Sequence, residues 1–335
     1  MTAATDRLAM KAIVQVAYGS PGGFELREIE KPVLTKDDRV LVRVHAAALN
    51  AGDVFIMRGV PRLVRLVAGW PKPKNYVPGW DVAGHVEEVG KNVRRLRPGD
   101  AVFGATGRAC AEFVSAKESE LCAKPGNLSL EAAAAVATAG VTALRALRDV
   151  GKLEAGQSVL VNGASGGVGT FAVQIAKKAL GASEVTGVCS TKKMDLVRRI
   201  GADHVIDYST RGESLVADGG RRYDLILDHA ANHSIAEWRR ALTPRGLYVA
   251  NSGHGGLRLA LKALVLSPFV RQVARPFVVA PGVEDLEYLK GLIEAGKVTP
   301  VIDPKAFSLR ETAEAIRYLA EGRAMGKVVI RVEEG

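Results

Sequence analysis

The sequence contains few cysteines and no long apolar run, and both absences narrow the class of protein. Its three cysteines, Cys110, Cys122 and Cys189, lie far apart and form no CxxC pair. This argues against a disulfide framework or a zinc knuckle and favours a reducing compartment, so we expect a cytoplasmic protein. No apolar run reaches the roughly 20 residues that cross a bilayer, so no membrane segment is expected. The opening residues, MTAATDRLAMK, lack the apolar core of a signal peptide and predict a short loose extension.

Acidic residues are in the minority, which gives the chain a formal net charge of +10. A basic surface can bind nucleic acid. Here the Lys and Arg residues are scattered and no RNA- or DNA-binding motif accompanies them. A solvated surface that partly serves an anionic cofactor is therefore the favoured interpretation, and we expect no nucleic-acid partner. The 335 residues suffice for two domains with separate cores.

The pattern of the chain changes near residue 131. Short strands and turns are predicted before it, at Lys11–Val16, Val40–Ala47, Val82–Val89 and Asp100–Phe103. An Ala-rich helix over Glu131–Val150 then leads into alternating strands and helices, which are typical of an α/β fold with a doubly wound parallel sheet. The strands predicted there are Ser158–Val161, Glu184–Val188, His204–Asp207, Tyr223–Asp228, Leu247–Asn251 and Phe277–Ala280, and the helices between them begin at Thr170, Lys192 and Ser234.

The tail, Val283–Val332, shows the patterns of two helices and a terminal strand, Lys327–Val332. We expect this tail to return to the first part of the chain. Residues 1–131 and 281–335 are therefore assigned to one domain and residues 132–280 to the other.

A glycine-rich turn joins a strand to a helix within Gln157–Gly181, QSVLVNGASGGVGTFAVQIAKKALG. Such a turn offers a diphosphate a set of bare N–H groups at the start of a helix. A Cβ would obstruct the turn, the approach of the phosphates and the packing of helix on strand, which explains the glycines. Because strand and helix are both predicted, we interpret the turn as a dinucleotide-binding site rather than a ligand-free loop. The binding residues predicted here are Gly163, Ser165, Gly166, Gly167, Val168 and Gly169.

Six segments together resemble one family. They are PGWDVAGHVEEVG (78–90), RPGDAVFG (97–104), ATAGVTAL (137–144), VNGASGGVG (161–169), GADHVIDY (201–208) and GKVVI (326–330). In this order, over nearly the whole chain, they are similar to the medium-chain dehydrogenase/reductase superfamily, and more closely to its zinc-independent quinone oxidoreductase branch. The resemblance implies a GroES-like domain and a Rossmann domain, with the cofactor in the cleft between them. We also expect a homodimer.

The resemblance also bears on whether the protein binds zinc. Zinc-dependent members of the superfamily carry zinc ligands at three positions, and each position can be matched to a residue of this sequence. These positions hold Asn50, Trp80 and Thr138 in this sequence. A catalytic zinc needs thiolate, imidazole or carboxylate ligands, which these side chains do not supply. The four-cysteine lobe of a structural zinc is also missing. We therefore expect no metal.

The end of the second strand of the Rossmann domain points to NADPH as the cofactor. NAD-preferring folds usually place an acid there, which binds the ribose 2′-hydroxyl. This chain instead continues with Cys189, Ser190 and Thr191 and then two lysines, groups that suit a 2′-phosphate. The resemblance implies that Lys193 and Tyr208 flank that phosphate. Asn232 and Asn251 follow the fourth and fifth strands at their carboxyl ends, the edge that faces the ligand in open α/β sheets, and they are predicted with Lys327 to be cofactor-binding residues.

Without zinc, the expected chemistry is hydride transfer to an already activated acceptor, a quinone or the β-carbon of an enone. The resemblance places Asn50, Asp53 and Thr142 near the nicotinamide and substrate. Asn50 could donate a hydrogen bond to a substrate carbonyl, although Asn50 and Asp53 are also common caps of a helix or turn. For Asp53 both interpretations stay open. His229 and His233 are either proton donors or ordinary loop histidines.

Two other functions remain open at this stage. One is a zinc-less alcohol or aldehyde reductase, and the other is a non-catalytic NADPH-binding protein with an RNA-binding role. The apolar segment Gly255–Pro276, with interspersed Arg and Lys, could wall the substrate site, contact a second subunit or lie on a membrane surface, the last being the least favoured.

Overall fold

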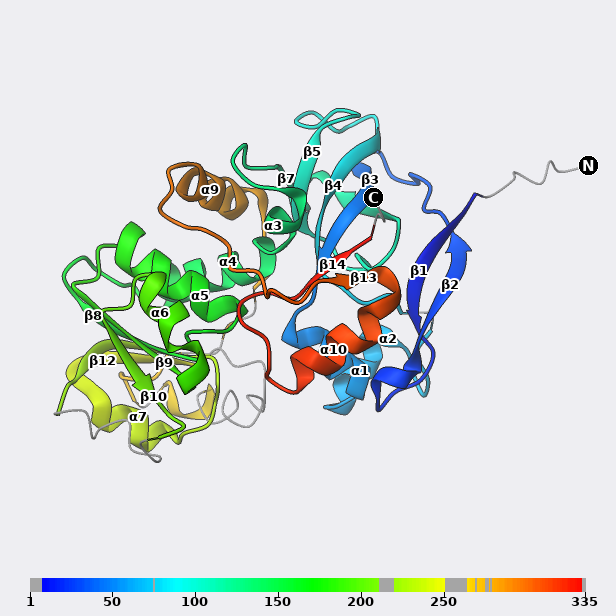
Figure 1. Cartoon of the computed structure of the whole chain (residues 1–335). Coiled ribbons are helices and arrows are strands. Elements are labelled where there is room, and N and C mark those ends of the chain that lie inside the picture. Colours follow the sequence, from blue (N-terminus) through cyan, green and yellow to red (C-terminus); the bar gives the residue numbers. More distant parts are fainter. Residues whose placement is uncertain are drawn as a thin grey trace, which may run out of the picture. The chain divides into compact units, whose positions relative to one another are not determined.

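The computed structural model describes residues 8–74, 76–210, 220–250, 264–268, 270–274, 277 and 279–332 (Figure 1). The chain divides into two compact units. Unit 1 comprises Met1–Thr138, Pro281–Lys290 and Ile302–Gly335, and unit 2 comprises Ala139–Ala280 and Gly291–Val301. The first boundary thus lies at Thr138 rather than at 131, and Gly291–Val301 joins the second unit.

Unit 2 contains a five-stranded sheet in the order β10-β9-β8-β11-β12, and every neighbouring pair in it is parallel. The chain runs outward from β8 to β10, then returns to the other side of β8 for β11 and β12. This reversal of strand order is the topological switch point of a doubly wound fold, so the α/β prediction is confirmed. The strands are β8 (Ser158–Asn162), β9 (Glu184–Cys189), β10 (His204–Asp207), β11 (Tyr223–Asp228) and β12 (Leu242–Ala250).

The helices that connect these strands pack on the sheet through their apolar sides. Buried residues such as Phe171, Val197 and Trp238 fill the space between helices and strands. The helices of this part are α4 (Ala137–Arg145), α5 (Gly167–Gln174), α6 (Met194–Arg199) and α7 (Ile235–Ala241), and α4 and α5 continue as single π-helical turns, Ala146–Val150 and Ile175–Ala179.

The predicted strand Phe277–Ala280 is wrong, since residues 277, 279 and 280 lie outside any strand. The outer edge of β12 is paired a few residues earlier. Tyr248 donates its backbone N–H to Gln272 at 2.8 Å and accepts that of Ala274 at 2.9 Å. This single bridge around Val273 occupies the edge where a further strand would have been added.

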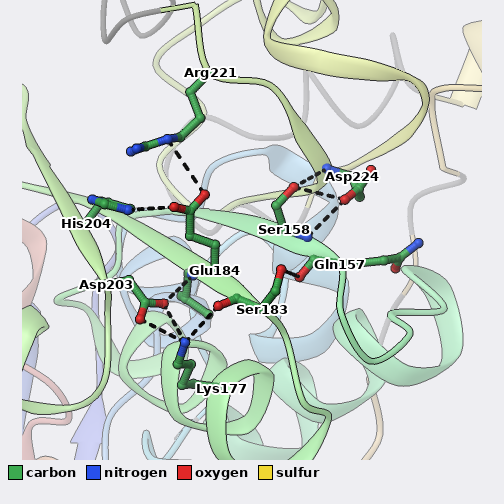
Figure 2. Close-up of polar contacts among 10 residues, drawn as sticks. Gln157, Ser158, Lys177, Ser183, Glu184, Asp203, His204, Arg221 and Asp224 are labelled. Carbon is green, nitrogen blue, oxygen red and sulfur yellow. Dashed lines mark hydrogen bonds and ion pairs between the residues drawn. The ribbon is translucent and has the colours of Figure 1, made fainter.

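Polar contacts fasten the amino ends of the parallel strands in unit 2 (Figure 2). Asp224 accepts both the backbone N–H and the hydroxyl of Ser158 at 2.9 Å, which joins the starts of β11 and β8. Glu184 binds His204 Nε2 at 2.7 Å, and Lys177 lies 2.8 Å from Asp203. In open α/β sheets ligands bind at the opposite, carboxyl edge. This polar edge therefore aligns the strands that carry the candidate site at their far ends.

Unit 1 is mainly β, as predicted. A seven-stranded sheet has the order β13-β14-β3-β4-β5-β7, with β6 paired to β3, and β1 and β2 form a separate antiparallel pair. Its strands are β1 (Ala9–Gln15), β2 (Phe24–Glu30), β3 (Arg39–Ala48), β4 (Asp81–Val89), β5 (Ala101–Ala105), β6 (Phe113–Lys117), β7 (Leu121–Ala123), β13 (Phe307–Ser308) and β14 (Val329–Arg331).

In the described part of unit 1, four α-helices accompany this sheet, and α9 ends in the second unit. They are α1 (Ala51–Arg58), α2 (Arg65–Ala68), α3 (Leu130–Ala134) and α10 (Thr312–Ala320), and α9 spans Val283–Glu294. Strand β14 pairs with β3, which confirms that the tail returns to the first part of the chain. Within the described ranges, no helix is both long and apolar enough to cross a bilayer.

Candidate functional site

The glycine turn lies at the carboxyl end of β8, where the doubly wound sheet reverses its strand order. Gly163 has a φ of +82°, a conformation that other residues adopt only with strain. A Cβ on Gly169 would collide with the carbonyl oxygen of Gly163, so the turn and α5 can pack this closely only with glycine there. The six residues predicted to bind the diphosphate, Gly163, Ser165, Gly166, Gly167, Val168 and Gly169, form this one turn and the first residues of α5.

The start of α5 is suited to an anion. Gly166 occupies the N-cap position, and no side chain caps the helix. The first N–H groups of a helix have no acceptor within the helix, and its dipole is positive at this end. The glycine cradle and the uncapped N-terminus therefore fit the diphosphate of a dinucleotide, which would bind through these backbone N–H groups.

A buried carboxylate, Asp228, organises the neighbouring loop at the switch point. It is fully buried at the end of β11, and its register partner on β8 is Asn162. Its donors are Asn162 Nδ2 at 2.8 Å, Ala230 N at 3.1 Å, Ala231 N at 2.9 Å, Trp238 Nε1 at 2.9 Å and the Tyr248 hydroxyl at 2.9 Å. Asn162 also donates to Asn232 Oδ1 at 2.8 Å. Asn232, a predicted cofactor residue, is thus held beside the glycine turn.

The end of β9 carries the residues predicted to select the cofactor. Ser190 precedes a short 3₁₀ turn, Thr191–Lys193, and Tyr208 follows β10 with half of its surface exposed. The adjacent carboxylate, Asp207, accepts Thr191 Oγ1 at 2.6 Å and the backbone N–H of Ser209 at 2.8 Å. These hydrogen bonds hold the pKa of Asp207 below its usual range. No acidic side chain follows β9 directly, in agreement with the sequence.

Two further predicted site residues are Thr142 and Asn251, and of these Thr142 lies in the described part of the chain. Thr142 lies in α4 and is largely buried at 8% exposure. It belongs to unit 2, whereas Asn50 and Asp53 belong to unit 1. Asn251 lies outside the described residues, as does most of the segment 255–276.

Unit 1 contains a buried polar cluster of its own (Asn50, Asp81, Thr138 and Lys327). Lys327 Nζ donates to Asn50 Oδ1 at 2.7 Å and to Asp81 Oδ2 at 2.8 Å. The side chains of Lys327 and Asp81 are 3% and 0% exposed. Asn50 Nδ2 donates to the same Asp81 oxygen at 3.0 Å. Burial at this level strengthens the ion pair and makes each partner costly to remove.

The other oxygen of Asp81 holds the start of α4. It accepts the Thr138 backbone N–H at 2.9 Å and also a short hydrogen bond from the Thr138 hydroxyl. A carboxylate from a strand thus acts as a cap for a helix 57 residues away in sequence. This explains why the helix predicted over Glu131–Val150 is divided into α3 and α4.

Asp53 acts as a buried structural acceptor. Its two oxygens accept the backbone N–H of Asn50 and that of Gly79, each at 2.8 Å. Burial raises the pKa of Asp53 to about 6, against the opposing effects of these two hydrogen bonds and the Lys327 charge. The capping interpretation of Asp53 therefore describes its contacts. Asn50 occupies the N-cap position of α1, and its side chain bonds Lys327 and Asp81.

The positions matched to zinc ligands do not fit a zinc ion. The side chains of Asn50 and Thr138 are committed to Lys327 and Asp81. Trp80 donates its Nε1 to the hydroxyl of Tyr76 at 3.1 Å. Among the described residues no group of three or more His, Cys, Asp or Glu side chains is arranged to hold a metal. The buried ammonium of Lys327 is itself a cation, and a metal beside it would meet strong repulsion.

Sequence reasoning missed Asp81 and Asp228. Each is a carboxylate at one end of a strand, next to buried apolar residues, and its side chain is fully buried. An acid that alternation places on the inner face of a strand was the available signal, since buried charges require partners. Lys327 was predicted as a cofactor residue, and the structure places its amine on Asn50 and Asp81.

Comparison with known proteins matches a family model to each part of the chain. Residues 36–191 match the family described as an alcohol dehydrogenase GroES-like domain, and residues 200–330 match one described as a zinc-binding dehydrogenase. A 2-methylene-furan-3-one reductase of Solanum lycopersicum is 36% identical, over 96% of this chain and 79% of the relative. An NADPH-dependent alkenal/one oxidoreductase of Arabidopsis thaliana is 35% identical with the same coverage. The structure of a quinone oxidoreductase from Coxiella burnetii superimposes with a TM-score of 0.86 at 27% identity, covering 97% of this chain and all of the other.

The fold and the family matches thus define a nicotinamide-dependent oxidoreductase of the α/β class. The chain belongs to the medium-chain dehydrogenase/reductase superfamily, in its zinc-independent quinone oxidoreductase branch.

Proposed function

We propose that the protein is an NADPH-dependent reductase of quinones or α,β-unsaturated carbonyls that transfers hydride without a metal. One observation carries the proposal: all three positions matched to zinc ligands hold other side chains, while the phosphate turn is kept. Asn50 and Thr138 are tied to the Lys327–Asp81 ion pair, and α5 keeps an uncapped N-terminus beside its glycine cradle. Such a site lacks the Lewis acid that alcohol oxidation would use.

The names of the relatives support the substrate class. The tomato and Arabidopsis relatives are named for the reduction of a furanone and of alkenals or alkenones, and the Coxiella protein is named a quinone oxidoreductase. All three names refer to acceptors with a conjugated carbonyl or quinone group. We extend this class, and no individual substrate, to the present chain.

NADPH is proposed over NADH because β9 ends without an acid. Ser190, Lys193 and Tyr208 would surround the 2′-phosphate, with Lys193 supplying the charge. Asp207, the nearby carboxylate after β10, already accepts hydrogen bonds from Thr191 and Ser209. The Arabidopsis relative, whose name specifies NADPH, agrees with this choice.

The proposed mechanism assigns positioning tasks to the residues of this chain. NADPH, when bound, would supply the hydride for reduction of an enone at its β-carbon or of a quinone. Asn50 donates a hydrogen bond to the acceptor carbonyl oxygen, where negative charge develops. Thr142 orients the reactants, and solvent delivers the proton that completes the two-electron reduction. Orientation alone can supply a large part of such a barrier, so no side chain has to act as the acid.

Stereospecifically deuterated NADPH tests this function. We expect the label to appear on the reduced carbon of an enone product, and activity with quinones and enones to persist in a chelator. Label lost to solvent would contradict direct hydride transfer. Turnover of aldehydes alone would favour a zinc-less aldehyde reductase, and NADPH binding without turnover but with salt-sensitive RNA binding would favour a non-catalytic role. In the same assay, Asn50→Ala should lower turnover more than NADPH affinity.

A further inference from the structure

The side-chain amide of Asn50 lies between two groups of opposite hydrogen-bonding character. Its oxygen faces the Lys327 ammonium at 2.7 Å, and a group of this type can only donate. Its nitrogen faces the Asp81 carboxylate at 3.0 Å, and an ionised carboxylate can only accept. A 180° flip of the amide would set N–H groups against the ammonium and an oxygen against the carboxylate. The ion pair therefore fixes the orientation of the Asn50 amide, with its oxygen towards Lys327 and its nitrogen towards Asp81.

This arrangement decides what Asn50 can offer to a ligand. The amide nitrogen carries two hydrogens, and one of them is used by Asp81. In the described part of the chain the other has no acceptor, whereas the amide oxygen is taken by Lys327. Asn50 is half-buried, while Lys327 and Asp81 beneath it are nearly inaccessible. The side that remains available to a ligand is thus an N–H donor.

We propose that Lys327 and Asp81 are positioning residues that lock the Asn50 amide as a hydrogen-bond donor, and so select acceptors whose carbonyl oxygen can receive it. This rests on the proposed function. Lys327 then acts through Asn50 and not on the cofactor. The hydrogen bond from the Asn50 N–H to the carbonyl oxygen strengthens as negative charge develops on that oxygen during hydride transfer. The fixed orientation of the amide therefore contributes chiefly to kcat.

Single substitutions of the pair confound orientation with stability. Lys327→Met leaves the Asp81 carboxylate buried without its cation, which destabilises the fold strongly. Asp81 alone would also still hold the amide nitrogen. The informative variant is therefore the double substitution Lys327→Met with Asp81→Asn, which removes both charges together. The new amide at position 81 keeps an oxygen for Thr138 and turns its NH₂ group towards Asn50, which favours the flipped Asn50 amide.

The test compares thermal stability and kinetics for Lys327→Met, the double variant and Tyr318→Phe. Tyr318 donates to Asp303 at 3.2 Å in the same unit and serves as a control for loss of one hydrogen bond elsewhere. We expect the double variant to regain most of the stability lost in Lys327→Met while its kcat with an enone stays about 10- to 100-fold low and KM changes less than about threefold. Tyr318→Phe should keep its kcat. Recovery of both stability and kcat in the double variant would overturn the proposal.

A second readout does not depend on turnover. In protein labelled with ¹⁵N-asparagine, one Asn50 side-chain proton should resonate downfield and exchange slowly, because it is bonded to a buried carboxylate. The double variant should lose that signal. Two averaged amide protons in the unchanged protein would refute the lock even if the enzyme reduces enones, whereas a locked amide in a protein without reductase activity would refute only the proposed function.

Discussion

Gln174 and Thr299 are joined by two hydrogen bonds between one side chain and one peptide unit. Gln174 Nε2 donates to the Thr299 carbonyl, and the Thr299 N–H donates to Gln174 Oε1, both at 2.9 Å. Gln174 Nε2 also donates to Thr170 at 2.9 Å within α5. These contacts fix Gly291–Val301 to the helix that follows the glycine turn, and they explain why this part of the tail belongs to unit 2.

Replacing Gln174 should therefore lower the stability of unit 2. Gln174 is 2% exposed, and Gln174→Leu would leave two carbonyls and one N–H without a side-chain partner in a site closed to water. We expect the free energy of unfolding in urea to fall by about 2–4 kcal/mol. Gln174→Glu should be worse near pH 8 than near pH 5, because its carboxylate would face two carbonyl oxygens. A change under about 0.5 kcal/mol for the leucine variant would contradict this account.

Lys193→Ala tests the proposed 2′-phosphate contact. Loss of a charged hydrogen bond should weaken NADPH binding by about 1–3 kcal/mol, equivalent to roughly 5- to 150-fold in Kd. NADH, which lacks the phosphate, should bind with nearly unchanged affinity. Lys178→Ala, which removes an exposed lysine from the same unit, is the charge-matched control. Fluorescence titration measures the affinity of each cofactor for the unchanged protein and for both variants, and an equal loss for NADPH and NADH in Lys193→Ala would rule out a phosphate contact.

Gly169→Ala tests the packing of the phosphate turn. The added Cβ would collide with the Gly163 carbonyl and lie 2.8 Å from Ala164 Cα, so the turn or the helix must shift. We expect a loss of about 1–3 kcal/mol in stability together with weaker dinucleotide binding. Gly291→Ala in α9 is the matched control, since its Cβ would meet nothing within 4 Å. That variant should gain about 0.5–1 kcal/mol, and similar behaviour of the two would contradict the cradle.

The elements that the sequence predicted are those defined by short-range patterns. The turn from Gly163 to Gly169 depends on neighbours within one strand and one helix, and so do strands such as Tyr223–Asp228, which the structure reproduces residue for residue. The pairing of Asn50 with Lys327 joins positions 277 residues apart, and Asp81 reaches Thr138 across 57. No local periodicity encodes such contacts. The register of β14 and β4 on either side of β3 brings Asn50, Lys327 and Asp81 together.

In the Ala-rich run 131–150 a long-range contact interrupts an element that the local sequence predicts. Its helical propensity predicted one continuous helix. Tertiary contact with Asp81 overrides that propensity at Thr138, because a buried carboxylate that accepts two hydrogen bonds outweighs one turn of helix. The division into α3 and α4 therefore depends on a residue that the local sequence does not contain.

Asp53 should make the stability of the protein depend on pH in an unusual direction. Burial raises its pKa to about 6 in the folded protein, from 3.8 for the free group. Between these values the folded state retains a proton that the unfolded state has released, so this carboxyl lowers stability as pH rises from about 4 to about 6. The full effect is on the order of 3 kcal/mol, at 1.36 kcal/mol per pKa unit. Carboxyls with lowered pKa values, such as Glu87 and Glu131, act in the opposite sense.

The contribution of Asp53 is isolated by subtracting a variant that cannot titrate. The charged groups around it are Lys327 and Asp81, while burial raises the pKa of Tyr76 and of Cys110, so both keep their protons in this range. Asp53→Asn keeps the shape but offers one oxygen to two backbone N–H groups, so it should be less stable at every pH. The difference in free energy of unfolding between the unchanged protein and this variant should be largest near pH 4. It should shrink towards pH 7, because the Asp53 carboxyl of the unchanged protein contributes less stability once it is ionised. Urea unfolding at intervals between pH 4 and 8 measures this difference. A deficit that stays flat, or that grows with pH, would show that Asp53 is already ionised near pH 4 in the folded protein.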